Sequence, residues 1–161
     1  MKTIVITGTP GTGKSTLAAL LCKTFHYTRI DVNNVIKQHH LSEGYDRRRK
    51  TKIIDTKKLN TVLQQIIQNS STPLVIDSHL AHDLPKRYVD VCVVTTTDLG
   101  TLKKRLQKRR YSTKKITENL QAEIFHVCLE EAQKRGHKIM AVNTSNKQDL
   151  KKLFSFINHD R

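Results

Sequence analysis

Residues 3–16, TIVITGTPGTGKST, contain the pattern that decides the fold. Residues 3–7 are apolar and β-branched, as expected for a buried strand, and LAALLCKTF, which follows residue 16, has the spacing of an amphipathic helix. Between them, residues 8–15 match G-x-x-x-x-G-K-[ST]. A strand that leads through this pattern into a helix is the context of a phosphate-binding loop, or P-loop.

The residues of this loop have the chemistry to hold a nucleoside triphosphate. Gly11 and Gly13 allow backbone N–H groups to turn toward phosphate oxygens, and the helix that follows adds the partial positive charge of its N-terminus. Lys14 can reach the β- and γ-phosphates, and the hydroxyl of Ser15 can bind Mg²⁺. The structural alternative is a glycine turn that binds nothing.

A second stretch, VIDSHLAHDLP at 75–85, reads as a buried strand that ends in a carboxylate, Asp77. In P-loop folds the strand beside the P-loop strand carries an acid near Mg²⁺ at its carboxyl end, and Asp77 is the candidate for this role. His79 follows two residues later and is the candidate for a catalytic contribution. The structural alternatives are a turn cap for Asp77 and an ordinary polar surface position for His79.

Composition sets the broad class of the chain. Its 161 residues correspond to one domain, and no window approaches 18 consecutive apolar residues, so we expect an intracellular, cytoplasmic protein without a membrane partner. The formal charge of +15 favours polyanionic partners such as nucleotides or RNA. Cys22, Cys92 and Cys128 form no CxxC pair, and we expect buried reduced thiols rather than a zinc site or a disulfide.

The rest of the chain alternates short apolar runs with helical patterns, which predicts an α/β fold with a parallel sheet covered on both faces. The expected strands are 3–7, 27–30, 73–77, 89–95 and 138–142. A single helix is expected over 112–134, with Ser112 or Thr113 as its N-cap and Gly136 at its C-terminal end. Two polar, basic segments, 41–56 and 103–115, fit simple strand–helix units poorly and are expected to be mobile.

Size and layout favour a small nucleoside monophosphate kinase. In such kinases, arginines of a lid cover the transferred phosphoryl group and a second insertion holds the acceptor nucleotide. Arg105 and Arg109 are four residues apart and could both point at phosphates. A run such as KKRLQKRR is equally compatible with a solvated or RNA-binding surface, and the residues alone leave both possibilities open.

Several motifs, taken together and in order, closely resemble the adenylate kinase isoenzyme 6 family, in its archaeal-type form. The resemblance extends through essentially the whole chain. Its most specific parts are the Asp-x-His after the third strand and the Y-S-x-x-K-I-x-x-N-x-Q-x-E-I-F helix. The motifs are GTPGTGKST (8–16), GYD (44–46), IID (53–55), DSH (77–79) with Pro85 and Arg87, RLQKRRYSTKKITENLQAEIF (105–125) and SNK (145–147).

The resemblance implies a P-loop nucleoside monophosphate kinase fold with a five-stranded parallel sheet, a monophosphate-binding region at about 31–54 and a lid at about 108–118. It implies that Asp77 orders Mg²⁺ and water while His79 affects turnover. Arg109 would contact ATP from the lid, and Lys147 would lie by the adenine. The residues implied to hold the ATP phosphates and Mg²⁺ are Gly11, Thr12, Gly13, Lys14, Ser15 and Thr16.

Three positions depart from the family pattern. The segment after GYD is basic, Arg47 to Lys50, where relatives are acidic, and this reversal favours an RNA contact. Lys37 stands where an arginine would grip the acceptor phosphate, and lysine keeps the charge but loses the bidentate fork. Arg110 replaces a glycine before Tyr111, which we expect to stiffen the lid.

The leading hypothesis is Mg²⁺-dependent transfer of the ATP γ-phosphoryl group to AMP, with Lys14, Mg²⁺, Arg105 and Arg109 neutralising charge. The resemblance also implies ATPase activity and a role in small ribosomal subunit maturation and rRNA processing. The rival is an assembly ATPase whose nucleotide state switches its binding to a small-subunit ribosomal protein or rRNA. A kinase of the shikimate or dephospho-CoA type shares the fold but lacks recognisable acceptor-site residues here.

Overall fold

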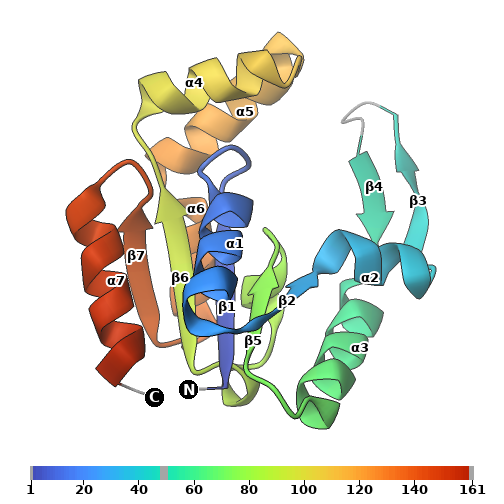
Figure 1. Ribbon diagram of the computed structural model, residues 1–161. Helices are drawn as coiled ribbons and strands as arrows, with labels where there is room; N and C mark the ends of the chain where they lie inside the picture. Colours follow the sequence, from blue (N-terminus) through green and yellow to red (C-terminus); the bar gives the residue numbers. More distant parts are fainter. Residues whose placement is uncertain (1, 48–50, 160–161) are drawn as a thin grey trace.

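The computed structural model describes residues 2–47 and 51–159, which form a parallel five-stranded sheet surrounded by helices (Figure 1). The strand order is β2-β5-β1-β6-β7, so the P-loop strand lies at the centre. This confirms the predicted fold class, and each expected strand is present within two residues of its predicted bounds. The strands are β1 (Thr3–Gly8), β2 (Thr28–Asp31), β5 (Leu74–Asp77), β6 (Val91–Thr96) and β7 (Ile139–Asn143).

Strand register places the polar strand ends at one edge of the sheet. β5 lies beside β1 with Asp77 opposite Ile6, so the carboxylate is next to the start of the P-loop. On its other side β5 pairs with β2, and Asp31 lies opposite Asp77. Because all five strands are parallel, these carboxyl ends meet at the same edge, where ligands bind in open α/β sheets.

Alternate residues of the strands contribute to two apolar cores, one on each face of the sheet. On one face, α1 (Lys14–Phe25) and α7 (Lys147–His159) pack on Ile4 and Ile6. On the other, α2 (Val32–Gln38), α3 (Thr56–Asn69) and α6 (Val127–Lys134) contribute to the core around Val5 and Ile76. Strands buried on both faces explain why the sequence runs are apolar throughout.

Helices α4 (Leu99–Lys108) and α5 (Thr113–Ile124) stand above the carboxyl edge of the sheet (Figure 1). Segment 103–115 contains the end of α4 at 103–108, anchored by the fully buried Leu102 and Leu106, and the start of α5 at 113–115. Its expected mobility stays a prediction. The predicted helix 112–134 is two helices, since the chain breaks at Phe125 and His126, where His126 has a positive φ of 49°. Ser112 does cap α5, accepting a hydrogen bond from the backbone N–H of Lys115.

The described residues of segment 41–56, namely 41–47 and 51–56, include regular secondary structure. The segment contains an antiparallel hairpin of β3 (Ser42–Asp46) and β4 (Thr51–Ile54), set apart from the main sheet beside α2 (Figure 1). Within the basic run, Arg48 to Lys50 lie outside the described residues. Two short 3₁₀ helices, Ala81–Asp83 and Lys86–Tyr88, connect β5 to β6.

The remaining expectations concern cysteines and membranes. Cys92 is buried, whereas Cys22 and Cys128 are half-buried, and all three are free thiols. Burial raises the pKa of Cys92 to about 12, so this side chain is a neutral thiol at physiological pH. Among the described residues, no helix combines the length and apolar composition that a membrane crossing requires.

Candidate active site

The P-loop connects β1 to α1 in a conformation that depends on glycine. Gly11 and Gly13 have φ values of 96° and 98°, which L-amino acids with a Cβ rarely adopt. A Cβ at Gly11 would also lie 2.9 Å from Cδ1 of Leu102 in α4. Gly13 is the N-cap of α1, so the loop leads its backbone N–H groups toward the place where a phosphate would bind.

Two threonines that are distant in the chain, Thr95 on β6 and Thr144 after β7, stabilise the conformation of the P-loop through hydrogen bonds to Thr12. Thr12 is fully buried, and its hydroxyl donates to the carbonyl of Thr9 and shares a 2.6 Å hydrogen bond with the hydroxyl of Thr95. Thr144, in the loop after β7, donates to the carbonyl of Thr12. The side chain of Thr12, a predicted ATP-binding residue, thus stabilises the loop from within and does not face a cavity.

Lys14 lies inside the curve of the loop. Its ammonium group donates to the carbonyls of Gly8 and Thr9 at 2.7 and 3.0 Å. Burial lowers the pKa of Lys14 to about 8, and the nearby carboxylate of Asp77 only partly offsets this effect. An anionic phosphate in contact with this lysine would stabilise its protonated form.

Asp77 is 6% exposed, and its Oδ2 accepts a hydrogen bond from Nη2 of Arg29 at 2.5 Å. Arg29 is on β2, two residues before the position that pairs with Asp77. This ion pair keeps a buried carboxylate compensated by charge. Sequence reasoning missed Arg29, because only the strand order reveals that β2 adjoins β5.

His79 lies in the loop after β5 and lines three neighbouring cavities. Burial lowers the pKa of His79 below its usual value, and the charges of Lys14 and His82 lower it further. The imidazole is therefore neutral at pH 7, and a neutral imidazole can accept or donate a hydrogen bond.

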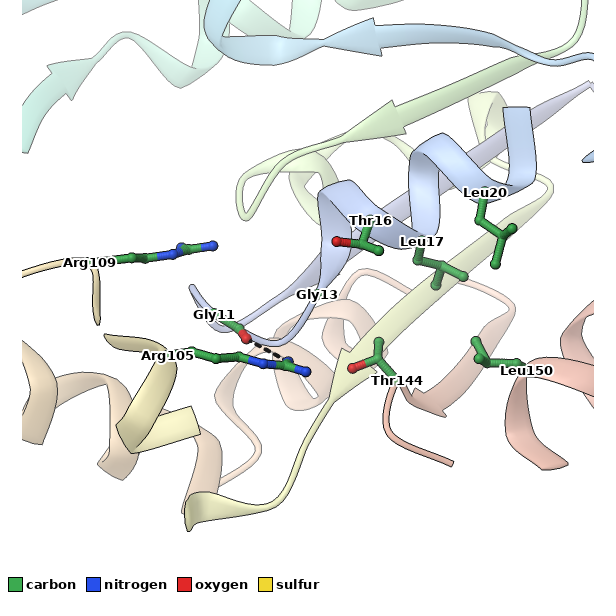
Figure 2. Close-up of a pocket in the computed structure, with 9 residues that line it drawn as sticks. All are labelled: Gly11, Gly13, Thr16, Leu17, Leu20, Arg105, Arg109, Thr144 and Leu150. Atoms are coloured by element: carbon green, nitrogen blue, oxygen red, sulfur yellow. Dashed lines mark hydrogen bonds between the residues drawn. The ribbon is translucent and has the colours of Figure 1, made fainter. Parts of the chain in front are cut away.

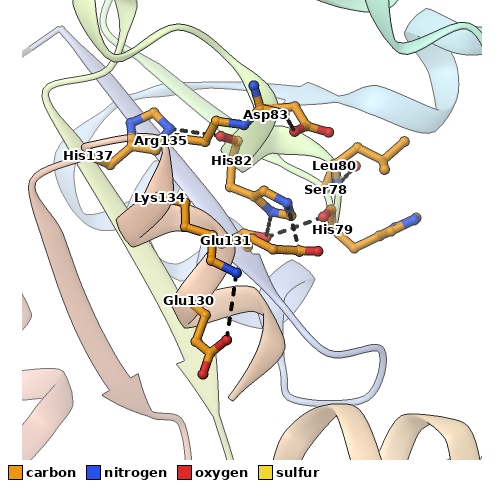
Figure 3. A network of polar contacts seen from close by, with 11 residues as sticks. Ser78, His79, Leu80, His82, Asp83, Glu130, Glu131, Lys134, Arg135 and His137 are labelled. Carbon is orange, nitrogen blue, oxygen red and sulfur yellow. Dashed lines mark hydrogen bonds and ion pairs between the residues drawn. The ribbon is translucent and has the colours of Figure 1, made fainter. Parts of the chain in front are cut away.

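A polar network behind His79 fixes this loop (Figure 3). The ring of His82 is buried between the hydroxyl of Thr7, 2.9 Å from Nδ1, and the carboxylate of Glu131, 3.1 Å from Nε2. Nε2 of His137 contacts the carbonyl of His82 at 2.8 Å. The loop that carries His79 is thereby attached to both β1 and α6.

A polar cavity next to the P-loop, called here the P-loop cavity, has a volume of about 650 Å³. It brings together the predicted residues Lys14, Asp77, His79 and Arg109. Sequence reasoning gave no site role to several other residues that line it, although Ser78, Tyr111, Lys115 and Asn119 belong to the motif stretches quoted above, because only the tertiary fold brings them to the P-loop. These are Asn33, Ser78, Tyr111, Lys115, Glu118 and Asn119.

A smaller pocket of about 250 Å³, the lid pocket, lies on the other side of Gly11 and Gly13 (Figure 2). Arg105 and Arg109 reach it from α4, and Nη1 of Arg105 donates to the carbonyl of Gly11 at 3.0 Å. The predicted adenine neighbour Lys147 is the first residue of α7 and does not line this pocket. Thr144 from the preceding loop and Leu150 from α7 do.

A third space, the hairpin cavity, measures about 690 Å³ and lies between the β3–β4 hairpin, α2 and the loop after β5. The predicted acceptor residue Lys37 lines it. The hairpin cavity and the P-loop cavity share Asn33, Ser78 and His79, so the two spaces adjoin at the end of β5. This arrangement can hold two ligands in contact.

Comparison with known sequences agrees with this geometry. A family model described as an AAA domain matches residues 4–126. The adenylate kinase isoenzyme 6 homolog of Schizosaccharomyces pombe is 40% identical over 129 residues, covering 80% of this chain and 73% of the relative. The corresponding homolog of Dictyostelium discoideum is 36% identical over the same coverage. The chain belongs to the adenylate kinase isoenzyme 6 family.

Other comparisons extend the range of similar proteins. A putative adenylate kinase of Methanocaldococcus jannaschii is 32% identical over 158 residues, covering 98% of this chain and 87% of the relative. Two solved structures share the fold. Shikimate kinase of Acinetobacter baumannii in complex with shikimate has a TM-score of 0.68 and 12% sequence identity, covering 100% of this chain and 95% of that one. Deoxyadenosine kinase of M. mycoides with bound dATP has a TM-score of 0.58 and 17% identity, covering 97% of this chain and 99% of that one.

In this member of the adenylate kinase isoenzyme 6 family, Arg110 has a structural role that explains why glycine is expected there. Its φ is +56°, and it follows Arg109, the C-cap of α4. The N–H of Arg110 donates to the carbonyl of Gln107 and that of Tyr111 to the carbonyl of Leu106, the pair of bonds of a Schellman motif. Arginine therefore occupies the left-handed position of this motif.

In this adenylate kinase isoenzyme 6 relative, the P-loop cavity contains oxygen-bearing side chains of the kind that Mg²⁺ binds. The described residues contain no cluster of three or more His, Cys, Asp or Glu arranged for a metal ion. Mg²⁺ does not need such a cluster in nucleotide sites, where one carboxylate, phosphate oxygens and water suffice. Ser15 and Asp77 both line the P-loop cavity and are the residues that would supply such oxygen ligands.

Proposed function

We propose that the protein is a Mg²⁺-dependent nucleoside monophosphate kinase that transfers the γ-phosphoryl group of ATP to AMP. The observation that supports this most directly is the pair of adjoining cavities. The P-loop cavity has the size and charge for a triphosphate, and the hairpin cavity opens into it at Ser78 and His79. Names of the relatives, which include adenylate kinase, agree with this assignment.

The chain's own residues have distinct tasks in the proposed reaction. The P-loop amides and Lys14 bind the donor phosphates, and Arg105 and Arg109 approach from α4 and its C-cap. Bound Mg²⁺, held by Ser15 and through Asp77, would neutralise charge on the phosphates. His79 lies where the two ligands meet and can hydrogen-bond to the attacking or transferred group in its neutral form. Positioning and charge neutralisation account for most of the catalysis of phosphoryl transfer.

The test is ADP formation from Mg-ATP with AMP titrated in, compared with an Asp77→Asn variant. We expect a saturable rise in ADP with AMP in the wild-type protein and at least about a hundredfold lower rate in the variant. ADP output that is indifferent to AMP would contradict the kinase assignment.

One observation favours a second candidate, an ATPase that binds a ribosomal protein or rRNA. Between residues 103 and 115 the chain has eight basic residues and no acid, and most of these side chains are exposed on the lid. Such a surface attracts RNA or an RNA-associated protein. Pull-down of small-subunit rRNA and ribosomal proteins with ATP and with ADP tests it, and equal retention in both nucleotide states would argue against a switch.

A further inference from the structure

The hairpin forms one wall of the hairpin cavity, and its pleat decides which side chains face it. Tyr45 on β3 and Lys52 on β4 are directly opposite in the antiparallel register, so both project from the same face. Ile54, two residues beyond Lys52, is on that face as well, and all three line the cavity. Ile53 alternates to the other face and is 49% exposed.

The charge of the hairpin cavity is positive. Lys37 from α2 and Lys52 from the hairpin both line it, and the described lining residues include no carboxylate. Within residues 2–47 and 51–159, no side-chain hydrogen bond or ion pair engages either ammonium group. Two uncompensated lysines at one cavity are suited to a doubly charged phosphate.

The same wall has an aromatic side chain available for stacking. Tyr45 is 57% exposed although it lines the cavity, so much of its ring is uncovered by protein. The other apolar lining residues are aliphatic, namely Ile36, Ile54 and Leu80. An uncovered aromatic ring beside two ammonium groups matches a ligand with a planar base attached to a phosphate.

We propose that Lys52 and Tyr45 determine the acceptor: Lys52 binds its phosphate together with Lys37, and Tyr45 stacks on its base. The pair of lysines replaces the bidentate contact that a single arginine at position 37 would make. This inference rests on the proposed kinase function.

The first experiment changes Lys52 to Met, with Lys57→Met as the matched control. Lys57 is an exposed lysine at the start of α3 that does not line the cavity. We expect Lys52→Met to raise the KM for AMP by roughly tenfold or more, with the KM for ATP and the melting temperature unchanged. Lys52→Arg should restore most of the affinity. A KM for AMP equal to that of the wild type in Lys52→Met would overturn the assignment.

The second experiment separates phosphate binding from base stacking. Inhibition constants of ribose 5-phosphate, which has the phosphate but no base, are compared with the KM for AMP in Tyr45→Leu and Tyr45→Phe. We expect Tyr45→Leu to weaken AMP by about tenfold while ribose 5-phosphate is unaffected, and Tyr45→Phe to resemble the wild type. Equal weakening of both ligands would refute the stacking role.

Direct binding distinguishes failure of this inference from failure of the proposed function. AMP binding is measured by calorimetry in the presence of a non-hydrolysable ATP analogue, so it does not depend on turnover. AMP that binds and loses affinity in Lys52→Met supports the inference even if no phosphoryl transfer follows. Absence of AMP binding to the wild-type protein would overturn it.

Discussion

At the scale of single residues, the contact between Arg29 and Asp77 is central to the site. Asp77 is buried, and its pairing with a guanidinium group from the neighbouring strand compensates its charge. A buried carboxylate without such a partner is costly, whereas a pair with good geometry is tolerated. The candidate magnesium residue therefore depends on a side chain that does not belong to the P-loop motif.

Replacement of Arg29 by Met should lower the free energy of unfolding by about 1–3 kcal/mol, because it leaves the carboxylate of Asp77 unpaired. Because Arg29 is 35% exposed, we expect a smaller loss of free energy of unfolding than for a fully buried ion pair. Urea denaturation measures the change. The double variant Arg29→Met, Asp77→Asn should recover part of the loss, and a single variant as stable as the wild type would contradict the role of the pair.

The lowered pKa of Lys14 predicts how nucleotide binding depends on pH. In the free protein the pKa is about 8, and a bound phosphate raises it because the anion favours the ammonium form. Affinity for Mg-ATP should thus be constant below pH 8 and fall by up to about tenfold per pH unit above it, until the pKa of the bound state is reached. Titration of a fluorescent ATP analogue measures this, with Lys14→Met as the control that loses the dependence. A dissociation constant that stays flat through this range would refute the prediction.

At the scale of elements, α4 ends in a left-handed residue that is an arginine, although glycine is usual at this position. The Schellman motif there requires a left-handed residue, and Arg110 takes this position with a φ of +56°. The same motif ends α6 with Gly136, whose φ is +74°, as the sequence predicted. Arginine has a Cβ and resists this conformation, so the turn between α4 and α5 contains strain that glycine would remove.

We therefore expect Arg110→Gly to raise the free energy of unfolding by about 0.5–1 kcal/mol. Lys108→Gly, in the last turn of the same helix, is the matched control and should instead lower it by about the same amount. Thermal or urea unfolding of both variants provides the comparison. Destabilisation by both substitutions would show that the side chain of Arg110 contributes more than its backbone costs.

The break between α5 and α6 was not predictable from hydrophobic spacing. The apolar stripe from Ile116 through Leu129 keeps a helical period across the break. Only its α6 part reaches a core, because Leu129 packs there whereas Ile124 of α5 is 51% exposed. Neither Gly nor Pro marks the break, and a histidine, His126, adopts the left-handed conformation instead. The direction change follows from where α5 and α6 must pack, one above the sheet edge and the other on a sheet face.

At the scale of the whole molecule, the excess of positive charge acts on every anionic ligand. The charge of +15 attracts nucleotides over distances longer than a contact, and salt screens this attraction. Two of the basic side chains between residues 103 and 115, Arg109 and Lys115, line the P-loop cavity, where we expect the effect on nucleotides to be largest.

Raising KCl from about 0.05 to about 0.5 M should weaken ATP and AMP binding several-fold, because the Debye length falls well below the size of the cavities. Adenosine, which has no phosphate, is the control and should bind with little salt dependence. Calorimetry at both salt concentrations measures the three affinities. Equal salt effects on adenosine and ATP would show that the charge excess does not act on the phosphates.

The sequence alone determined the P-loop pattern and the five strands, and it named Asp77 and His79 as candidate site residues, because these depend on short local patterns with a direct chemical meaning. The family resemblance was also present in the chain itself. The tertiary structure decided the pairing of Arg29 with Asp77, the attachment of Thr144 to the P-loop, and the hairpin that places Tyr45 and Lys52 at the hairpin cavity. These contacts join residues far apart in the chain, and strand order and packing, which no local pattern encodes, bring them together.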